Sequence, residues 1–344
     1  MFRYFAFFLL LLSTFSISAQ SQDLADYYVA GIGFYNLENL FDTKDDADVK
    51  DEEFTPNGER AWDASSYNEK ISNLATVIYG LGTEQTPDGL ACLGVSEIEN
   101  KKVLEDLVAQ PQLATRNYEI IHYDSPDKRG IDVAFLYQPD YFTPTSSKSI
   151  PVNLDGRSTR DVLLVSGDFD GEPMHFIVNH WPSRRGGENV SGHKRVKAAL
   201  VCKGIIDSLT AIDPNAKVVI MGDLNDGPKN ESIKNHLGAK GKKQDVRKGD
   251  LYNPMFMYYM TGVGSLAHRD SWNIFDQIIL SSGLVYGRPD GYKYYKTRIE
   301  NRTQLVQKLG RYRGYPKRTF AGSNYQGGFS DHFPVYVYIV KPVK

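Results

Sequence analysis

The sequence predicts an α/β fold that is rich in strands. Short runs of β-branched and aromatic residues alternate along the chain with stretches of helical periodicity. No internal repeat and no linker rich in Pro, Gly or Ser divides the 344 residues into two halves. A single domain spanning residues 25–342 is therefore expected.

Each expected element follows from local composition and length. Strands are predicted where a short apolar, β-branched or aromatic run is bounded by polar or turn-forming residues, at residues 28–35, 90–95, 131–137, 162–165, 175–179, 218–221, 275–280 and 335–340. Helices are predicted where apolar residues recur over longer stretches, at residues 67–80, 102–109 and 194–209. The alternation of the two patterns predicts sheets covered by helices.

The overall composition is that of a globular protein. Hydrophobic residues make up 41% of the chain and charged residues 24%, which excludes disorder, collagen and coiled coil. The formal net charge of −2 gives no general attraction to nucleic acid or to an anionic membrane. Any such attraction has to come from a local cluster of charge.

The N-terminus has the pattern of an export signal. An apolar run from Phe5 to Leu12 follows Arg3, is too short to span a bilayer, and leads into small polar residues that end at Ala19. We interpret residues 1–19 as a cleaved signal peptide and expect an exported protein, periplasmic or secreted. The alternative is an uncleaved N-terminal membrane anchor.

Neither of the two cysteines looks like a metal ligand or a nucleophile. Cys92 and Cys202 both lie in apolar strings, where cysteine usually behaves as a small buried hydrophobe. A disulfide between them is the alternative in an exported protein.

Polar strings follow apolar strands in five places. A single string of this kind is weak evidence, because strands end in polar residues and Asp and Asn also form turns. Five strings that combine acids, amides and imidazoles match the needs of a hard divalent cation and a general base. They lie where sites collect in α/β sheets, at Phe34–Asn39, Val95–Asn100, Val178–Pro182, Met221–Asp226 and Phe329–Pro334.

These strings resemble those of the endonuclease/exonuclease/phosphatase superfamily, the DNase I-like metal-dependent phosphoesterases. The most specific strings are Gly222-Asp223-Leu224-Asn225 and Ser330-Asp331-His332-Phe333-Pro334-Val335. Three further segments look like exported bacterial members, namely Asn36–Asp42, Arg129–Ala134 and Asn179–Gly187. The resemblance implies a four-layer α/β sandwich with two packed mixed β-sheets flanked by helices.

The resemblance also implies a divalent metal, Mg²⁺ first and Mn²⁺ or Ca²⁺ as alternatives. Glu97 matches the central metal carboxylate of the superfamily, and Glu38 and Asp331 match further acids near the metal. Glu99 is left out of this set, because it fits better as an acid at a helix N-terminus.

The implied catalytic residues are Asn36, His180, Asp223, Asn225, Asp276 and His332. Asn36, His180 and Asn225 match groups that contact the phosphate, and Asp276 matches an acid that orients His332. The general base is either His332 or Asp223. Other interpretations remain for three positions: a tight turn at Asp223 and Asn225, a surface histidine at position 180, and a structural cap at Asp276.

Basic residues offer candidate contacts to substrate. Arg129, Arg184, Arg185 and Arg195 are expected to hold a substrate phosphate. Residues 293–318 are basic with interleaved tyrosines, which is the composition of a groove for a phosphate backbone with stacked bases. A solvated basic loop is the alternative. The acidic residues 42–53 are interpreted as a solvated loop, with an additional Ca²⁺ site as the alternative.

The sequence therefore favours a secreted or periplasmic metal-dependent nuclease. It is expected to act on nucleic acid as a monomer, without a stable membrane anchor. The first alternative is a phosphoesterase acting on phospholipid or a small molecule, for which the aromatic run 255–260 offers an imperfect membrane contact. The second alternative is a non-catalytic binding module of the same fold.

Overall fold

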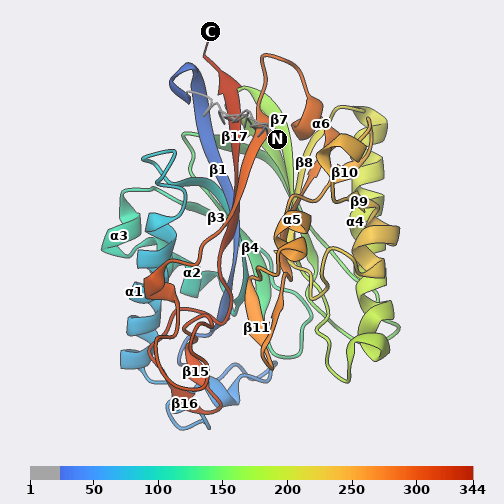
Figure 1. The fold of residues 1–344 in the computed structure, drawn as a ribbon. Coiled ribbons are helices and arrows are strands. Elements are labelled where there is room, and N and C mark those ends of the chain that lie inside the picture. The colour runs from blue at the N-terminus through green and yellow to red at the C-terminus, as the bar shows by residue number, and fades with distance from the viewer. Residues whose placement is uncertain (1–23, 344) are drawn as a thin grey trace, which may run out of the picture.

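The computed structural model describes residues 24–343, which form two β-sheets packed face to face with helices on their outer surfaces (Figure 1). The expected four-layer α/β sandwich is confirmed. The interpretation of residues 1–19 as a signal peptide falls outside the described part of the chain. Within residues 24–343, no helix is both long enough and apolar enough to cross a membrane.

The first sheet has six strands and is mixed. Its only parallel pair is β1 with β2, and the other neighbours run antiparallel. The order across the sheet is β14 (Lys293–Ile299), β17 (Val335–Pro342), β1 (Tyr27–Leu40), β2 (Leu90–Ile98), β4 (Asp132–Tyr137) and β3 (Glu119–His122).

The second sheet has seven strands and is also mixed. Strands β7 and β8 run parallel, as do the short β9 and β10. The order is β5 (Phe142–Ile150), β6 (Val162–Phe169), β7 (Glu172–His180), β8 (Lys217–Asp223), β13 (Asp276–Ser281), β10 (Leu251–Tyr252) and β9 (Ala239–Lys240).

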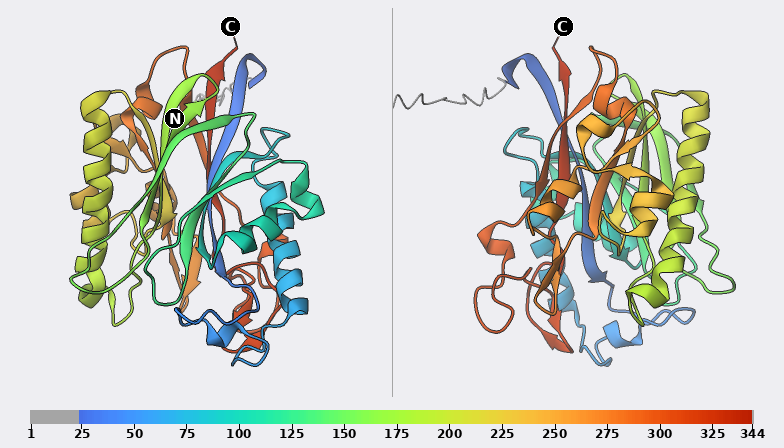
Figure 2. Two further views of the ribbon diagram at one scale, coloured as in Figure 1. Left: turned by 180° about the vertical axis from the view of Figure 1, so that it is seen from behind. Right: turned by 45° about the vertical axis from the view of Figure 1, so that its right-hand side comes forward.

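Helices cover the outer face of each sheet (Figures 1 and 2). The first sheet carries α1 (Ala64–Gly80), α2 (Lys101–Val108) and α3 (Pro111–Ala114), and the second carries α4 (Glu188–Ile212). Helices α1 and α2 begin where Asp63 and Asn100 accept a hydrogen bond from the backbone three residues on, as helix N-caps do.

Smaller elements connect the layers. They are α5 (Met255–Met260), α6 (Ser282–Tyr286), the hairpins β11 (Leu266–His268) with β12 (Ser271–Asn273) and β15 (Phe320–Ala321) with β16 (Asn324–Tyr325), 3₁₀ turns at Leu24–Asp26, Glu52–Phe54, Lys243–Asp245 and Thr303–Leu305, and a π-helical turn at Ser232–Leu237.

The two sheets approach most closely where side chains are small. Gly94 of β2 faces the second sheet, and a Cβ atom there would lie 2.5 Å from Met221 Sδ and 3.0 Å from Val178 Cγ1. Strands β2 and β8 are buried along nearly their whole length. Strands that are buried on both faces have continuous apolar sequences, and for this reason the sequence predicted both of them.

Several strands were not expected, among them β3, β5 and β14, each of which lies at the edge of a sheet. Strand β5 has the polar sequence FTPTSSKSI and β14 the basic sequence KYYKTRI. Edge strands bury less and carry polar residues, so neither shows the apolar pattern of a central strand. The alternative of a solvated basic loop is therefore wrong for residues 293–299, because β14 pairs with β17.

The interpretation of the cysteines as buried hydrophobes is confirmed. Cys92 lies in β2 and Cys202 in α4, and both are free and buried. In α5, Met255 is buried, whereas Met257 and Met260 are each more than half exposed.

Replacing Gly94 with Leu should destabilise the protein. The added side chain meets Met221 and Val178 between the sheets, and overpacking of this kind costs about 1–3 kcal/mol. The free energy of unfolding in urea measures the effect. The control is Gly204→Ala on the exposed side of α4, where a Cβ meets no atom within 4 Å and should stabilise the helix by up to about 1 kcal/mol. An unchanged unfolding midpoint for Gly94→Leu would contradict the close approach of the sheets.

Candidate active site

The expected site residues come together at one end of the sandwich, where strands of both sheets end or begin. In the second sheet, Asp223 at the end of β8 pairs with His180 of β7 on one side and with Asp276 of β13 on the other. In the first sheet, Asn36 of β1 pairs with Ser96 of β2, next to Glu97. The strand registers therefore explain why residues far apart in sequence meet here.

The backbone is distorted at this end of the strands. Glu38, Glu97 and Asn225 have positive φ angles of 50°, 58° and 49°. The pairing of β1 with β2 shifts register after Asn36, and that of β2 with β4 shifts after Ser96. Left-handed conformations of residues other than glycine cost about 1 kcal/mol or more and cluster at functional sites.

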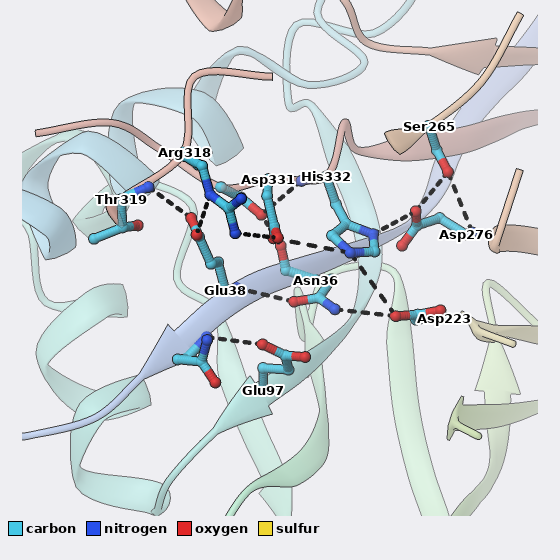
Figure 3. A network of polar contacts seen from close by, with 12 residues as sticks. Asn36, Glu38, Glu97, Asp223, Ser265, Asp276, Arg318, Thr319, Asp331 and His332 are labelled. Atoms are coloured by element: carbon cyan, nitrogen blue, oxygen red, sulfur yellow. Dashed lines mark hydrogen bonds and ion pairs between the residues drawn. The ribbon is translucent and has the colours of Figure 1, made fainter. Parts of the chain in front are cut away.

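Asp223 is the centre of the constellation. Its Oδ2 accepts a hydrogen bond from Asn36 Nδ2 at 3.2 Å and lies 3.9 Å from His332 Nε2 (Figure 3). The same oxygen lies 3.6 Å from His180 Nε2. Burial raises the pKa of Asp223 to about 7; the charge of His332 lowers it and that of Asp276 raises it. The carboxyl group therefore titrates near neutral pH.

His332 is oriented by Asp276. Its Nδ1 lies 2.7 Å from Asp276 Oδ2, which also accepts a hydrogen bond from Ser265 Oγ at 2.5 Å (Figure 3). Its Nε2 faces Asp331 Oδ1 at 3.8 Å. Burial lowers the pKa of His332, but Asp276, Asp331 and Asp223 together raise it well above its usual value. Asp276 is thus more than a strand cap, and Ser265 is a supporting residue that no sequence motif indicated.

His180 is buried beside two carboxylates. Its Nε2 lies 3.8 Å from Glu97 Oε1, in addition to its contact with Asp223. Burial lowers its pKa well below the usual value, and the charges of Arg160 and Arg129 lower it further. A neutral ring can carry its proton on Nε2 and donate it towards the site. The alternative of a surface histidine is wrong, because only 4% of His180 is exposed.

Glu97 and Asp331 offer oxygen ligands at the mouth of the site. Glu97 Oε2 accepts the backbone N–H of Asn39 at 3.0 Å, while its Oε1 accepts no hydrogen bond from the described residues. The Asp331 side chain is 33% exposed, compared with 15% for Glu97. Accessible carboxylate oxygens of this kind fit a hard divalent cation such as Mg²⁺.

Glu38 bonds to the segment that carries Arg318 and Thr319. Its Oε1 accepts a bond from Arg318 Nε at 3.3 Å and its Oε2 one from the Thr319 backbone at 2.6 Å (Figure 3). Arg318 also donates to Asp331 Oδ2 at 2.9 Å. Both oxygens of Glu38 therefore hold the segment that carries Arg318, and its assignment as a metal ligand remains a prediction.

Lys70 is a buried residue that the sequence did not single out. It is fully buried on the inner face of α1 and donates to Thr319 Oγ1 at 2.5 Å and to the Phe329 carbonyl at 3.2 Å. Burial lowers its pKa to about 8. Its position beside Ile71 and Leu74, on the apolar face of the helix, was the available signal.

Asn225 follows Asp223 in a tight turn, so the turn alternative is correct for its backbone. Its N–H donates to Asp223 Oδ1 at 2.9 Å, and its side chain donates to the Trp181 carbonyl at 3.0 Å. Arg160, also missed from the sequence, is buried and donates to the carbonyls of His180 and Trp181. These bonds fix the loop that follows β7.

The four expected substrate arginines separate into two pairs. Arg195 is fully buried and bonded to Asp226, and Arg184 donates to the Asn225 carbonyl and to Asp226. The expectation that Arg195 contacts substrate is therefore wrong, because its guanidinium has no accessible surface. Arg129 and Arg185 are exposed, and the charge of Arg129 is close enough to act on His180.

A cavity of about 390 Å³ opens beside Asp331 and Arg318. The second half of the basic segment supplies much of its lining, together with the β11–β12 hairpin. Charged and aromatic residues of the lining include His268, Arg269, Asp270, Arg311, Tyr312 and Tyr315. Arg318 lies at the inner end of this cavity, where it donates to Glu38 and Asp331.

Solved structures with this fold include proteins with different substrates. D. rerio TDP2 complexed with single strand DNA product is 14% identical, with a TM-score of 0.54 over 90% of this chain and 98% of that one. A mannosyl-6-phosphatase from Bacteroides thetaiotaomicron is 16% identical, with a TM-score of 0.54 over 90% and 99%. An endonuclease/exonuclease/phosphatase family protein from the same organism is 16% identical, with a TM-score of 0.54 over 92% and 99%.

Similarity at this level of identity establishes the fold. No curated protein matches the chain. The model of the Endonuclease/Exonuclease/phosphatase family matches residues 31–341, which include every residue of the site described above. The chain belongs to the endonuclease/exonuclease/phosphatase family, whose fold is that of phosphoester hydrolases.

Proposed function

We propose that the protein is a metal-dependent phosphodiesterase that hydrolyses nucleic acid. The observation that carries the proposal is the meeting of Asn36, His180 and His332 around the Asp223 carboxylate, with Glu97 beside them. This set combines one carboxylate that titrates near neutral pH with three hydrogen-bond donors. Such a combination suits attack of water on a phosphate anion.

Glu97 and Asp331 are the residues that would hold the cation. When bound, a divalent cation neutralises the charge of the phosphoryl oxygens and of the departing oxygen. The side chains of the protein supply the remaining steps. Asn36 and neutral His180 donate hydrogen bonds to oxygens on which negative charge builds as water attacks.

Asp223 is the proposed general base and His332 the proposed charged donor. Asp223 takes a proton from water as the new P–O bond forms and the ester P–O bond breaks. His332, whose Nδ1 is held by Asp276, presents Nε2–H to a phosphoryl oxygen. Its three neighbouring carboxylates favour the protonated imidazole.

The cavity beside Asp331 supports a nucleotide substrate. Tyr312 and Tyr315 offer aromatic faces for a base, and Arg269 and Arg311 offer charge for a neighbouring phosphate. The similar fold of D. rerio TDP2 holds a single strand DNA product. We therefore favour single-stranded nucleic acid.

A second candidate is a phosphatase acting on a small phosphorylated molecule. The size of the cavity is compatible with it, since about 390 Å³ accommodates a phosphorylated sugar as well as a nucleotide. One solved structure of similar fold is a mannosyl-6-phosphatase. Export, suggested by the apolar run of residues 1–19, remains part of the proposal for either substrate.

Removal of the metal should abolish activity. Excess chelator and Glu97→Gln should each lower kcat/KM on a phosphodiester by more than about 100-fold, because both remove charge stabilisation of the transition state. Steady-state hydrolysis with and without added Mg²⁺ measures the effect. Glu105→Gln on the exposed side of α2 is the control and should leave the rate unchanged. Full turnover in chelator would contradict the metal requirement.

The pH dependence should identify the base. Asp223 acts only as a carboxylate, so the rate should fall as the pH drops below about 7. The groups that face this carboxylate are Asn36, Glu97, His180, Asp276 and His332. Asp223→Asn should lower kcat by about 10²–10⁴ and remove the acid limb, whereas His332→Gln should lower kcat and keep that limb. Loss of the acid limb in His332→Gln would return the role of base to His332.

Salt should distinguish a polymer from a small substrate. Arg311→Ser with Arg313→Ser should lower the slope of log KM against log salt for single-stranded DNA by about 1.4, because each contact releases about 0.7 counterion. Hydrolysis of a small diester, which has no neighbouring phosphate, should be unaffected. The control pair is Arg247→Ser with Arg288→Ser. Arg247 precedes β10 and Arg288 follows α6, and both elements adjoin the end of β13 that lies away from Asp276. A DNA slope as shallow as that of the small substrate would favour the phosphatase.

A further inference from the structure

A second group of acids lies outside the catalytic constellation, between the loop that follows β1 and the end of β2. Asp46, Asp51 and Glu99 each bring a carboxylate oxygen to within 4.8 Å of the other two. Asp46 and Asp51 belong to the acidic residues 42–53, and Glu99 follows β2 directly. The acidic segment is therefore not simply a solvated loop.

Two of these carboxylates are buried, and only one oxygen of each accepts a hydrogen bond. Asp51 is 1% exposed and Glu99 6% exposed. One oxygen of each accepts a backbone hydrogen bond, from Asp46 N to Asp51 Oδ2 at 3.1 Å and from Asp42 N to Glu99 Oε2 at 2.6 Å. The other oxygens, Asp51 Oδ1 and Glu99 Oε1, are buried without any hydrogen-bond partner.

No basic side chain balances this charge in the part of the chain that the structure describes. Within residues 24–343, Asp46, Asp51 and Glu99 form no ion pair with lysine, arginine or histidine. Buried carboxylates that face one another repel, and a buried charge without a partner is strongly unfavourable. A cation bound between them would relieve this repulsion.

We propose that Asp46, Asp51 and Glu99 bind a Ca²⁺ ion that is separate from the catalytic metal. Ca²⁺ binds carboxylate oxygens at about 2.3–2.6 Å in flexible geometry. A single Ca²⁺ ion can therefore contact three carboxylate oxygens that lie within 4.8 Å of one another. Mg²⁺ requires a near-ideal octahedron and retains several waters, for which two buried carboxylates leave little room. The exposed Asp46 provides the side from which the ion and its waters enter.

This ion would join the loop to the strand that carries Glu97. Glu99 lies two residues beyond Glu97, and Asp42 lies in the loop that follows β1. The loop is further anchored by Phe41, which stacks on Phe54 with ring centroids 4.3 Å apart. The ion is therefore expected to stabilise the fold without contacting the substrate, and the inference does not depend on the proposed function.

Calorimetric titration with Ca²⁺ alone tests the proposal. It is carried out in the Glu97→Gln variant, so that the catalytic metal site is already weakened. This variant should bind one Ca²⁺ per chain, and Ca²⁺ should raise its Tm. Adding Asp51→Asn and Glu99→Gln should abolish both the binding and the Tm shift. Asp46→Asn, at an exposed position that leaves the core intact, should weaken the affinity roughly tenfold.

The matched control replaces two exposed acids of the same segment that do not join the cluster, Asp45→Asn and Asp48→Asn. It should retain the affinity and the Tm shift. Equal Ca²⁺ binding before and after the Asp51 and Glu99 replacements would overturn the proposal, as would binding of Mg²⁺ with no response to Ca²⁺. If the combined variant fails to fold, an unchanged affinity in Asp46→Asn would overturn it.

Discussion

The hydrogen bond from Asn36 to Asp223 is the contact on which the arrangement of the site depends. It joins β1 of one sheet to β8 of the other, 187 positions apart in sequence. Because the sheets pack through apolar side chains, polar contacts between them can form only where the strands end. The residues of the candidate active site therefore lie at the rim of the interface between the sheets. In that position they are buried enough to shift the pKa of Asp223, and Asp331 still reaches solvent.

The rim also explains why strained backbone is found there. Regular pairing of β1 with β2 would send alternate side chains to opposite faces of the sheet. The register shifts after Asn36 and Ser96 interrupt that alternation. Glu97 can then bond to the backbone of Asn39, and Glu38 can hold the segment that carries Arg318. The packing of the two sheets supplies the stability that lets these distortions persist.

The sequence predicted the central strands, because strands buried on both faces are continuous apolar runs. It also predicted Asn36, Glu97, His180, Asp223, Asp276 and His332 as one constellation, since each follows or begins such a run. It missed β5 and β14, whose polar residues suit an edge. Arg195 was assigned to the wrong environment, because nothing in its neighbours reveals that Asp226 faces it in the core. Ser265 and Arg160 could not be predicted, because the residues they bond to, Asp276 for Ser265 and His180 and Trp181 for Arg160, are distant in sequence.

The buried amine of Lys70 has a consequence for how substitutions in α1 are interpreted. By composition, a lysine in this amphipathic helix looks like a solubilising surface residue that any polar side chain could replace. Its hydrogen bonds to Thr319 and Phe329 instead make the helix part of the support for the segment that leads to Asp331. A mutational scan should therefore find the outer face of α1 tolerant and position 70, on the buried inner face, intolerant even of other polar side chains. A residue with no contact to substrate would then limit which sequences of this helix remain compatible with an intact site.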